Sequence, residues 1–174
     1  AQSHLSLNGF MEPGQLLTPD CKARIAAELS KPICLPRKKD GLLRRYRFPN
    51  SRASCLVEAA VFFYERTNGI SHTLGLFRDP FDARDYLADH VSGVGLKEAS
   101  HILRNIGFSD SLAIVDSYIF RFVRELGLIN MASSEGVDRE SYLAVEEALS
   151  RVSERNDLNL SILDIAIWHF MRGR

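Results

Sequence analysis

The sequence has little of what membrane, disulfide-rich or metal-binding proteins need. No apolar run approaches the length that crosses a bilayer, and no charged, apolar and small-residue series at the start resembles a secretory signal. Cys21, Cys34 and Cys55 are odd in number and lack CxxC spacing, which argues against a disulfide framework and indicates a reducing compartment. The five histidines show no HxxxH or Cys/His spacing, so we expect no metal site. These absences predict a cytoplasmic protein without a membrane partner.

The composition is that of a globular chain. Its 174 residues are 45% hydrophobic and 25% charged, which is enough for one sizeable core. The formal net charge is zero, but the charges are unevenly distributed. Between Lys31 and Arg52 lie eight basic residues and a single acid, Asp40. A basic block on an otherwise acidic chain is a candidate phosphate-contacting patch, for which we select Arg44, Arg45 and Arg47. The alternative is a solvated loop.

The remaining pattern is helical. Caps, prolines, glycines and apolar spacing predict helices over about 18–30, 50–67, 80–91, 96–107, 116–126, 138–155 and 161–172. The near-continuous apolar centre at 59–63 predicts that the second helix is buried on most sides. Ser161 and Asp164 resemble a capping box at the start of the last helix. No alternating strand pattern of useful length occurs, so we predict an all-α fold with a single compact domain over 1–174.

A tight turn with two glycines joins the helices predicted at 80–91 and 96–107. Gly93 and Gly95 flank Val94, which would anchor the turn to the core. This hairpin leaves backbone N–H groups at the start of the second helix without intrahelical partners, and the helix dipole strengthens their attraction for an anion such as a DNA phosphate. The alternative is an ordinary corner between two helices.

Lys97 and Asp116 are the candidate chemical pair. Lys97 lies in the first turn of a helix, where the dipole disfavours a cation, and such breaches of local rules are expected at functional sites. We expect partial burial and the positive helix end to favour the uncharged, nucleophilic amine. Asp116 follows an apolar approach, Leu112 to Val115, and begins the next helix. Alone it is a plain N-cap; beside Lys97 it would be the electrostatic partner of a nucleophile.

The run GVGLKEASHILRNIGFSDSLAIVDSYIF resembles the helix-hairpin-helix and aspartate signature of the base-excision DNA glycosylases. GVGLK and AIVD, with their spacing, resemble the bifunctional 8-oxoguanine branch of that superfamily, and KEASHILRNIG is most similar to the type-2, largely archaeal, 8-oxoguanine DNA glycosylase/lyases. LDIAIWHFMRG is similar to that family's C-terminal helix. The specific match covers about residues 89–120, with the helix-hairpin-helix at about 80–107.

The resemblance implies a role for each matched residue. Lys97 would attack the sugar C1′ of a flipped-out nucleotide and form a Schiff base, and Asp116 would stabilise positive charge on the sugar. Gly93, Val94 and Gly95 would grip DNA phosphate, with a possible monovalent cation held by carbonyls of the turn and no other cofactor. Duplex DNA with a damaged base would be the partner of a monomeric, nucleoid-associated enzyme.

Three further residues follow from the resemblance. Trp168 would stack on the base, Asp164 would hydrogen-bond it or cap its helix, and Asn68 would fill the gap left in the duplex. The chain departs from the family pattern after Asp116, where Ser117 and Tyr118 stand in place of a histidine two positions on. This leaves the reaction type intact and the lesion open.

Three functions therefore compete. The first is a DNA glycosylase with AP-lyase activity on 8-oxoguanine. The second is a relative that acts on another modified purine. The third is a non-catalytic helix-hairpin-helix module that binds DNA. Lys97 and Asp116 favour the enzymes, because a hairpin that only grips phosphate needs neither residue.

Overall fold

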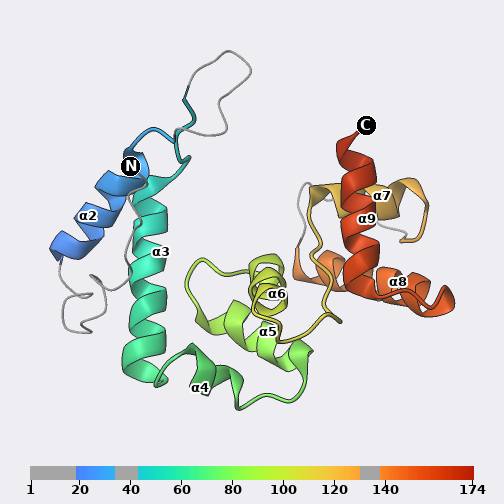
Figure 1. Ribbon diagram of the computed structural model, residues 1–174, viewed down its shortest axis with the longest axis horizontal. Coiled ribbons are helices and arrows are strands. Elements are labelled where there is room, and N and C mark those ends of the chain that lie inside the picture. Colours follow the sequence, from blue (N-terminus) through green and yellow to red (C-terminus); the bar gives the residue numbers. More distant parts are fainter. Residues whose placement is uncertain (1–18, 34–42, 130–137) are drawn as a thin grey trace. The chain divides into compact units, whose positions relative to one another are not determined.

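A computed structural model of the chain describes residues 19–33, 43–129 and 138–174. The chain groups into two compact units. Unit 1 comprises Ala1–Leu76 with Val91–Gly93, and unit 2 comprises Phe77–His90 with Val94–Arg174. Figure 1 labels the helices of both units.

Unit 1 is built on two helices that pack together, α2 (Pro19–Ser30) and α3 (Pro49–Val61). Pro49 begins α3, where its fixed φ suits a first helical turn. The helix then widens into the π-helix η2 (Phe62–Arg66) before α4 (Ile70–Leu74). Asn68 and Gly69 adopt positive φ angles, 57° and 99°, and end this run as the sequence predicts. The sequence did not predict the widened turn or α4.

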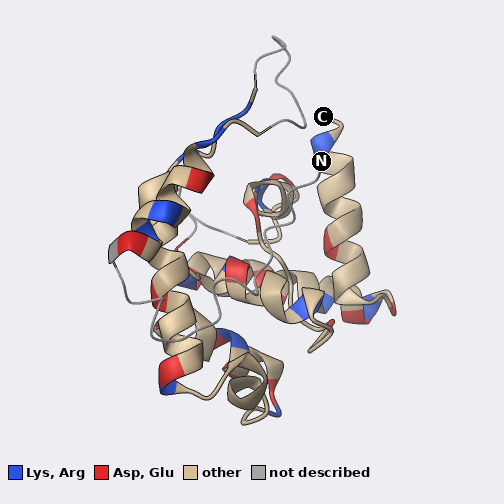
Figure 2. Cartoon of the chain, turned by 60° about the vertical axis from the view of Figure 1, so that its left-hand side comes forward, with Lys and Arg blue, Asp and Glu red and all other residues tan. Residues whose placement is uncertain are grey.

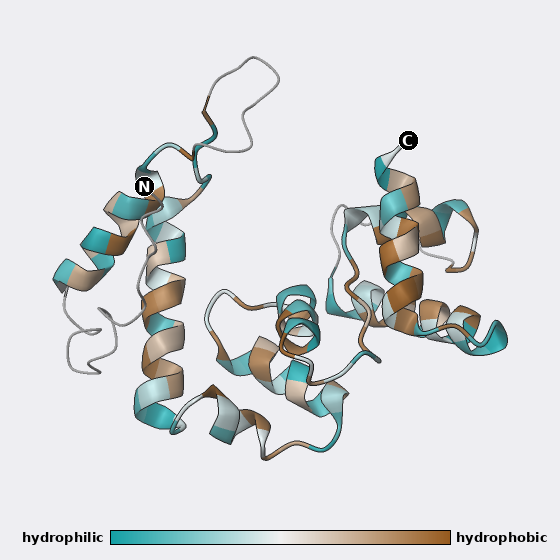
Figure 3. Ribbon diagram, in the orientation of Figure 1, coloured by the Kyte–Doolittle hydropathy of each residue, from teal (hydrophilic) through white to brown (hydrophobic). Residues whose placement is uncertain are grey.

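The apolar centre of α3 is not buried on most sides within the described part of the chain. Ala53 is the buried residue of this helix, and Leu56 is 50% exposed. Residues 59–63 are intermediate in burial. Figure 3 shows brown bands of hydrophobic residues along α3. The prediction of a nearly enclosed helix was therefore wrong, because an apolar run fixes a preference for burial and not the neighbours that provide it.

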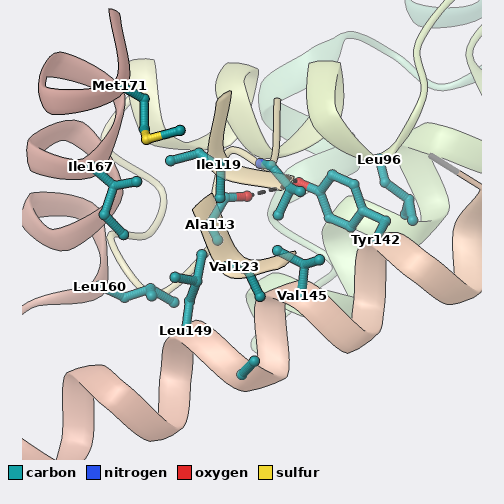
Figure 4. Close-up of a cluster of buried hydrophobic side chains, with 12 residues drawn as sticks. Leu96, Ala113, Ile119, Val123, Tyr142, Val145, Leu149, Leu160, Ile167 and Met171 are labelled. Carbon is teal, nitrogen blue, oxygen red and sulfur yellow. Dashed lines mark hydrogen bonds between the residues drawn. The ribbon is translucent and has the colours of Figure 1, made fainter. Parts of the chain in front are cut away.

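Unit 2 contains a cluster of buried hydrophobic residues. It is formed by α5 (Pro80–His90), α6 (Leu96–Asn105), α7 (Ser117–Glu125), α8 (Arg139–Arg155) and α9 (Leu160–Arg172). Helices α7, α8 and α9 pack on one another around buried aliphatic side chains. Figure 4 shows this cluster, to which Tyr142 contributes the aromatic ring. Each helix places an apolar stripe inward, as its 3.6-residue periodicity predicts.

Side-chain caps fix the starts of three helices in unit 2. Asp116 caps α7, Asp138 caps α8, and Asn159 caps α9 by accepting from the Ser161 N–H at 2.8 Å. The capping box predicted at Ser161 and Asp164 is wrong, because Asn159 provides the cap and Asp164 lies within the helix interior.

The all-α class predicted from the sequence is confirmed. The described residues form helices, with one isolated bridge between Ile33 and Arg44 as the sole β-type pairing among them. None of the helices in the described ranges is long and apolar enough to cross a bilayer. The prediction of one domain over 1–174 stays a prediction, since the chain groups into two compact units.

Candidate active site and DNA-contacting residues

The glycine turn is shaped by a close contact with α3. Gly93 has a φ of +74°, and a Cβ at this position would lie 2.5 Å from Cys55 Sγ. A glycine is therefore required at position 93 for backbone conformation and for space. Arg52, also on α3, donates from Nη1 to the Gly93 carbonyl at 3.4 Å. Val94 is half-buried and Gly95 is exposed.

The same contact bears on the monovalent cation implied by the resemblance. A cation on the Gly93 carbonyl would lie beside the Arg52 guanidinium, which already donates to that oxygen. Two positive charges on one carbonyl repel each other. A cation at the Gly93 carbonyl would therefore have to share that oxygen with the Arg52 guanidinium.

Lys97 and Asp116 line one cavity in unit 2. Its volume is about 550 Å³, within the range of small-molecule sites. The lining residues come from α5, α6, α8 and the start of α7: Ala88, Gly95, Leu96, Lys97, Glu98, Val115, Asp116, Ser117, Asp138, Arg139 and Tyr142. The structure thus brings the predicted pair together at a cavity large enough for a nucleobase or sugar.

Lys97 is exposed at the mouth of this cavity, so the predicted partial burial of its side chain is wrong. The reason is its position in the first turn of α6, where Leu96 and Ala99 take the buried face. Lys97 and Asp116 are both described residues, and they do not form an ion pair with each other. The amine is therefore free to approach a bound substrate.

Asp116 caps a helix with one of its two carboxylate oxygens and is among the residues that line the cavity. Oδ1 accepts from the backbone N–H groups of Tyr118 (2.9 Å) and Ile119 (3.0 Å) and so caps α7. No described side chain or backbone group hydrogen-bonds Oδ2. The plain capping role and the electrostatic role are therefore compatible in one residue.

The extended segment before Asp116 is held by side chains from α8 and α9. The Ala113 N–H donates to Glu146 Oε1 at 3.0 Å, and the Ile114 N–H donates to Asp164 Oδ2 at 2.8 Å. The Ala113 carbonyl accepts from the Tyr142 hydroxyl at 2.7 Å. Since no other described segment pairs with it as a strand, these side chains satisfy its backbone groups and fix where Asp116 begins α7.

Two arginines neutralise the buried carboxylates that hold this segment. Arg84 pairs with Glu146, and Arg104 pairs with Asp164 while also donating to the Ser161 carbonyl at 3.1 Å. Burial raises the pKa of the Glu146 and Asp164 carboxyls, and the arginines and backbone N–H groups oppose that rise. A buried ion pair is tolerated in a core because each member compensates the charge of the other, and removal of one member leaves an unpaired buried charge.

Asp164 does not line the cavity. It is 3% exposed, and its Oδ2 receives both the Ile114 N–H and Arg104. The structure gives Asp164 a structural role in holding the Ile114 N–H and Arg104, and its predicted contact with the base stays a prediction. The structural role of Asp164 had one signal in the sequence, which is Arg104, a basic residue in the last turn of α6 that could reach a buried acid.

Trp168 also lies outside the residues that line this cavity. It is half-buried against the core of unit 2, with its ring edge to face with Tyr118 at 6.4 Å between centroids. Arg172 lies over the indole at 4.9 Å from its centroid. The structure therefore places Trp168 in packing, and its predicted stacking on a base stays a prediction.

The predicted DNA contacts of unit 1 are on its surface. Arg44, Arg45 and Arg47 are exposed in the segment before α3, which Figure 2 shows in blue. Arg47 lies over the Phe48 ring at 5.8 Å. Asn68 is exposed with a left-handed backbone, a conformation that asparagine tolerates. The remaining residues of the basic block at 37–40 lie outside the described ranges.

The residues that the sequence did not single out are Asp138, Arg139, Tyr142 and Glu146. Arg139 is held at the cavity by Asp89 (2.9 Å) and Asp85 (2.8 Å) on α5. Tyr142 is the one with a sequence signal, since a tyrosine on the buried stripe of a helix needs a partner for its hydroxyl. Among the described residues, no cluster of histidines, cysteines and acids could hold a metal ion.

Comparisons with known proteins identify the family of the chain. A family model described as 8-oxoguanine DNA glycosylase matches residues 16–158. The chain is 35% identical over 129 residues to an 8-oxoguanine DNA glycosylase/AP lyase of Korarchaeum cryptofilum, and 34% identical over 129 residues to one of Thermotoga petrophila. The first alignment covers 74% of this chain and 59% of the relative, and the second 74% and 58%. The chain thus spans less than two thirds of these relatives.

Solved structures give the same result. The chain is similar to a Methanocaldococcus jannaschii 8-oxoguanine glycosylase/lyase that was crystallised with a 15mer DNA containing 8-oxoguanine. The TM-score is 0.69 at 29% identity, over 97% of this chain and 71% of that one. The 8-oxoguanine DNA glycosylase of Thermotoga maritima is similar with a TM-score of 0.60 at 33% identity, over 74% and 58% of the two chains.

Proposed function

We propose that this chain, which belongs to the 8-oxoguanine DNA glycosylase family, excises 8-oxoguanine from duplex DNA and cleaves the strand through a Schiff base on Lys97. The observation that carries the proposal is the shared cavity of Lys97 and Asp116. A base within a duplex cannot be reached by an enzyme, so the nucleotide would be flipped out to meet these two side chains.

The chemistry follows from the atoms at the cavity. The Lys97 amine, in its uncharged form, attacks C1′ and forms a C–N bond, while the bond from C1′ to the base breaks. The base takes the electron pair of that bond and the proton that the attacking nitrogen loses. Opening of the sugar ring gives the Schiff base. Loss of a C2′ proton then breaks the C3′–O bond by β-elimination and cleaves the strand.

The charges of the cavity suit this reaction. Three carboxylates (Glu98, Asp116 and Asp138) and two cations (Lys97 and Arg139) line it. Positive charge develops on the sugar as the base leaves, and fixed negative charge nearby stabilises it. Asp116 Oδ2 is the best-placed group for this role, because Oδ1 is fixed by the cap of α7.

Borohydride trapping tests the proposal. Duplex DNA with 8-oxoguanine is incubated with the protein, and borohydride reduces any Schiff base to a stable adduct. We expect an adduct with the wild type and none with Lys97→Gln. Lys22→Gln is the matched control, because Lys22 is an exposed lysine on α2, and it should form the adduct like the wild type.

The other outcomes identify the alternatives. An adduct with another modified purine and none with 8-oxoguanine would indicate a glycosylase that acts on that other purine. Retained DNA binding without an adduct on any lesion would contradict the enzymatic proposal and leave a DNA-binding module. The monomeric state and the location in the nucleoid stay predictions.

A further inference from the structure

The Tyr142 hydroxyl connects the two segments that carry the reactive pair. Tyr142 lies in α8, is 3% exposed and is among the residues that line the cavity. Its hydroxyl lies 3.0 Å from Ser100 Oγ on α6, one helical turn after Lys97. It also donates to the Ala113 carbonyl at 2.7 Å, in the segment that leads to Asp116. Figure 4 shows this last bond as a dashed line.

The proton positions follow from counting donors. A phenol has one hydrogen, and Ala113 offers only a carbonyl, so the Tyr142 hydrogen points to Ala113. Ser100 must therefore donate to the tyrosine oxygen, and the Val115 N–H reaches the same oxygen at 3.5 Å. The pKa of Tyr142 is raised to about 12, mainly because the hydroxyl is buried. The hydroxyl therefore stays a neutral donor at physiological pH.

We infer that Tyr142 is a positioning residue for the proposed reaction, and that its hydroxyl sets the distance between the Lys97 helix and Asp116. This inference rests on the proposed function. No other described side chain hydrogen-bonds both α6 and the segment 112–115 from within the cavity wall. Arg104 joins the same two segments through the Leu112 carbonyl at 3.4 Å, but it is absent from the cavity lining.

The geometry explains why a small change would matter. A displacement of about 1 Å in a reacting group can cost about a hundredfold in rate. Without the hydroxyl, the Ala113 carbonyl and the Ser100 hydroxyl both lose their partner, so α6 and the segment before Asp116 are no longer fixed to a common point. The distance between the Lys97 amine and Asp116 Oδ2 then varies.

Tyr142→Phe tests the inference, because it keeps the ring and removes the hydroxyl. The measurement is the single-turnover rate constant at saturating enzyme, on 8-oxoguanine duplex and on duplex with a preformed abasic site. We expect both rates to fall by about tenfold to a hundredfold, with the Kd for duplex DNA within about twofold of the wild type. Both substrates should be affected because both need Lys97 and Asp116.

Ser153→Ala is the control for lost stability. Ser153 is buried on the same helix, about three turns after Tyr142. Its hydroxyl donates to the Leu158 carbonyl. Its loss should lower the melting temperature without changing either rate. Ser100→Ala adds a second check: on its own it should slow the reaction, and in the Tyr142→Phe background it should cause no further loss.

Several results would overturn the inference. These are a Tyr142→Phe enzyme with wild-type single-turnover rates, a loss confined to the 8-oxoguanine substrate, or an additive loss in the double variant. If the wild type itself forms no adduct, the proposed function fails, which is a distinguishable outcome. A slow Ser153→Ala enzyme would show that any lost hydroxyl on α8 has the same effect, and would also contradict the inference.

Discussion

Asp116 caps α7 through one carboxylate oxygen, and we propose that the other oxygen serves the reaction. Oδ1 caps α7, and Oδ2 is the oxygen that remains for a substrate in the cavity. The sequence predicted both readings of this residue and could not choose between them. The capping role is present in the structure, and the electrostatic role stays a prediction that is compatible with it, because one carboxylate has enough lone pairs for both.

A pair of variants at Asp116 separates these tasks. Asp116→Asn keeps an oxygen for the cap but loses the charge, so we expect nearly wild-type thermal stability and a much reduced rate of adduct formation. Asp116→Ala loses both, and should also lower the free energy of unfolding by about 1 kcal/mol. Thermal unfolding and borohydride trapping are the two measurements. Equal stability of the two variants would contradict the capping role.

The sequence singled out those candidate site residues whose type is unusual or informative for their place in a helix. Lys97 was singled out because it is a basic residue in the first helical turn, where the helix dipole disfavours a positive charge. Asp116 was singled out because it directly precedes a helix. Tyr142 and Glu146 were missed, because their importance depends on backbone groups about thirty residues away in sequence. Burial of Lys97 was wrongly predicted, because exposure of a first-turn residue depends on its tertiary neighbours.

At the scale of elements, the segment 112–115 depends on buried ion pairs rather than on a strand partner. Asp164 accepts from the Ile114 N–H and is neutralised by Arg104. Helix starts and ends were predicted within a few residues, because caps and glycines are local signals. This segment was recognised only as an apolar approach to Asp116, since its partners come from α8 and α9.

Arg104→Met should destabilise the protein in a pH-dependent way. The pKa of Asp164 is already raised by burial, and loss of Arg104 removes a charge that opposes that rise. The folded state then holds a proton that the unfolded state releases above a pKa of about 4. Stability of the variant should therefore fall as the pH rises from about 4 through the folded-state pKa, and then level off.

The expected loss at neutral pH is about 3–5 kcal/mol, as for other broken buried pairs. Urea unfolding between pH 4 and pH 8 measures it. Arg151→Met is the matched control, because its pair with Glu147 (2.9 Å) is exposed on α8 and should contribute less than about 1 kcal/mol. A loss in Arg104→Met that is the same at every pH would contradict the role of Asp164 as the titrating group.

At the scale of the whole molecule, the two units differ in charge. Unit 1 has eleven basic and six acidic residues, a net charge of +5, and unit 2 has eleven basic and sixteen acidic residues, a net charge of −5. Figure 2 marks the charged residues of the described part. The cavity lies in the acidic unit, so attraction to DNA phosphate is expected to come mainly from the basic one.

Neutralising Arg44, Arg45 and Arg47 to Gln should weaken duplex binding regardless of sequence. If each arginine contacts a phosphate, the slope of log K against log salt should become shallower by about 3. The control triple variant changes exposed arginines of unit 2 to Gln, at positions Arg124, Arg151 and Arg155. It alters net charge equally and should leave the slope unchanged. Binding measured by fluorescence anisotropy at several salt concentrations would decide, and an unchanged slope in the first variant would remove these arginines from the interface.

The family predicted from the run around Lys97 is confirmed by the comparisons, and the activity remains a proposal. The separation of charge has a consequence for how such an enzyme would search a genome. The time that the enzyme spends bound to undamaged DNA would depend on the basic unit and would shorten as ionic strength rises. The rate of the reaction at a lesion would depend on the acidic unit. Salt would then change how often a lesion is found without changing how quickly it is cut once it is found.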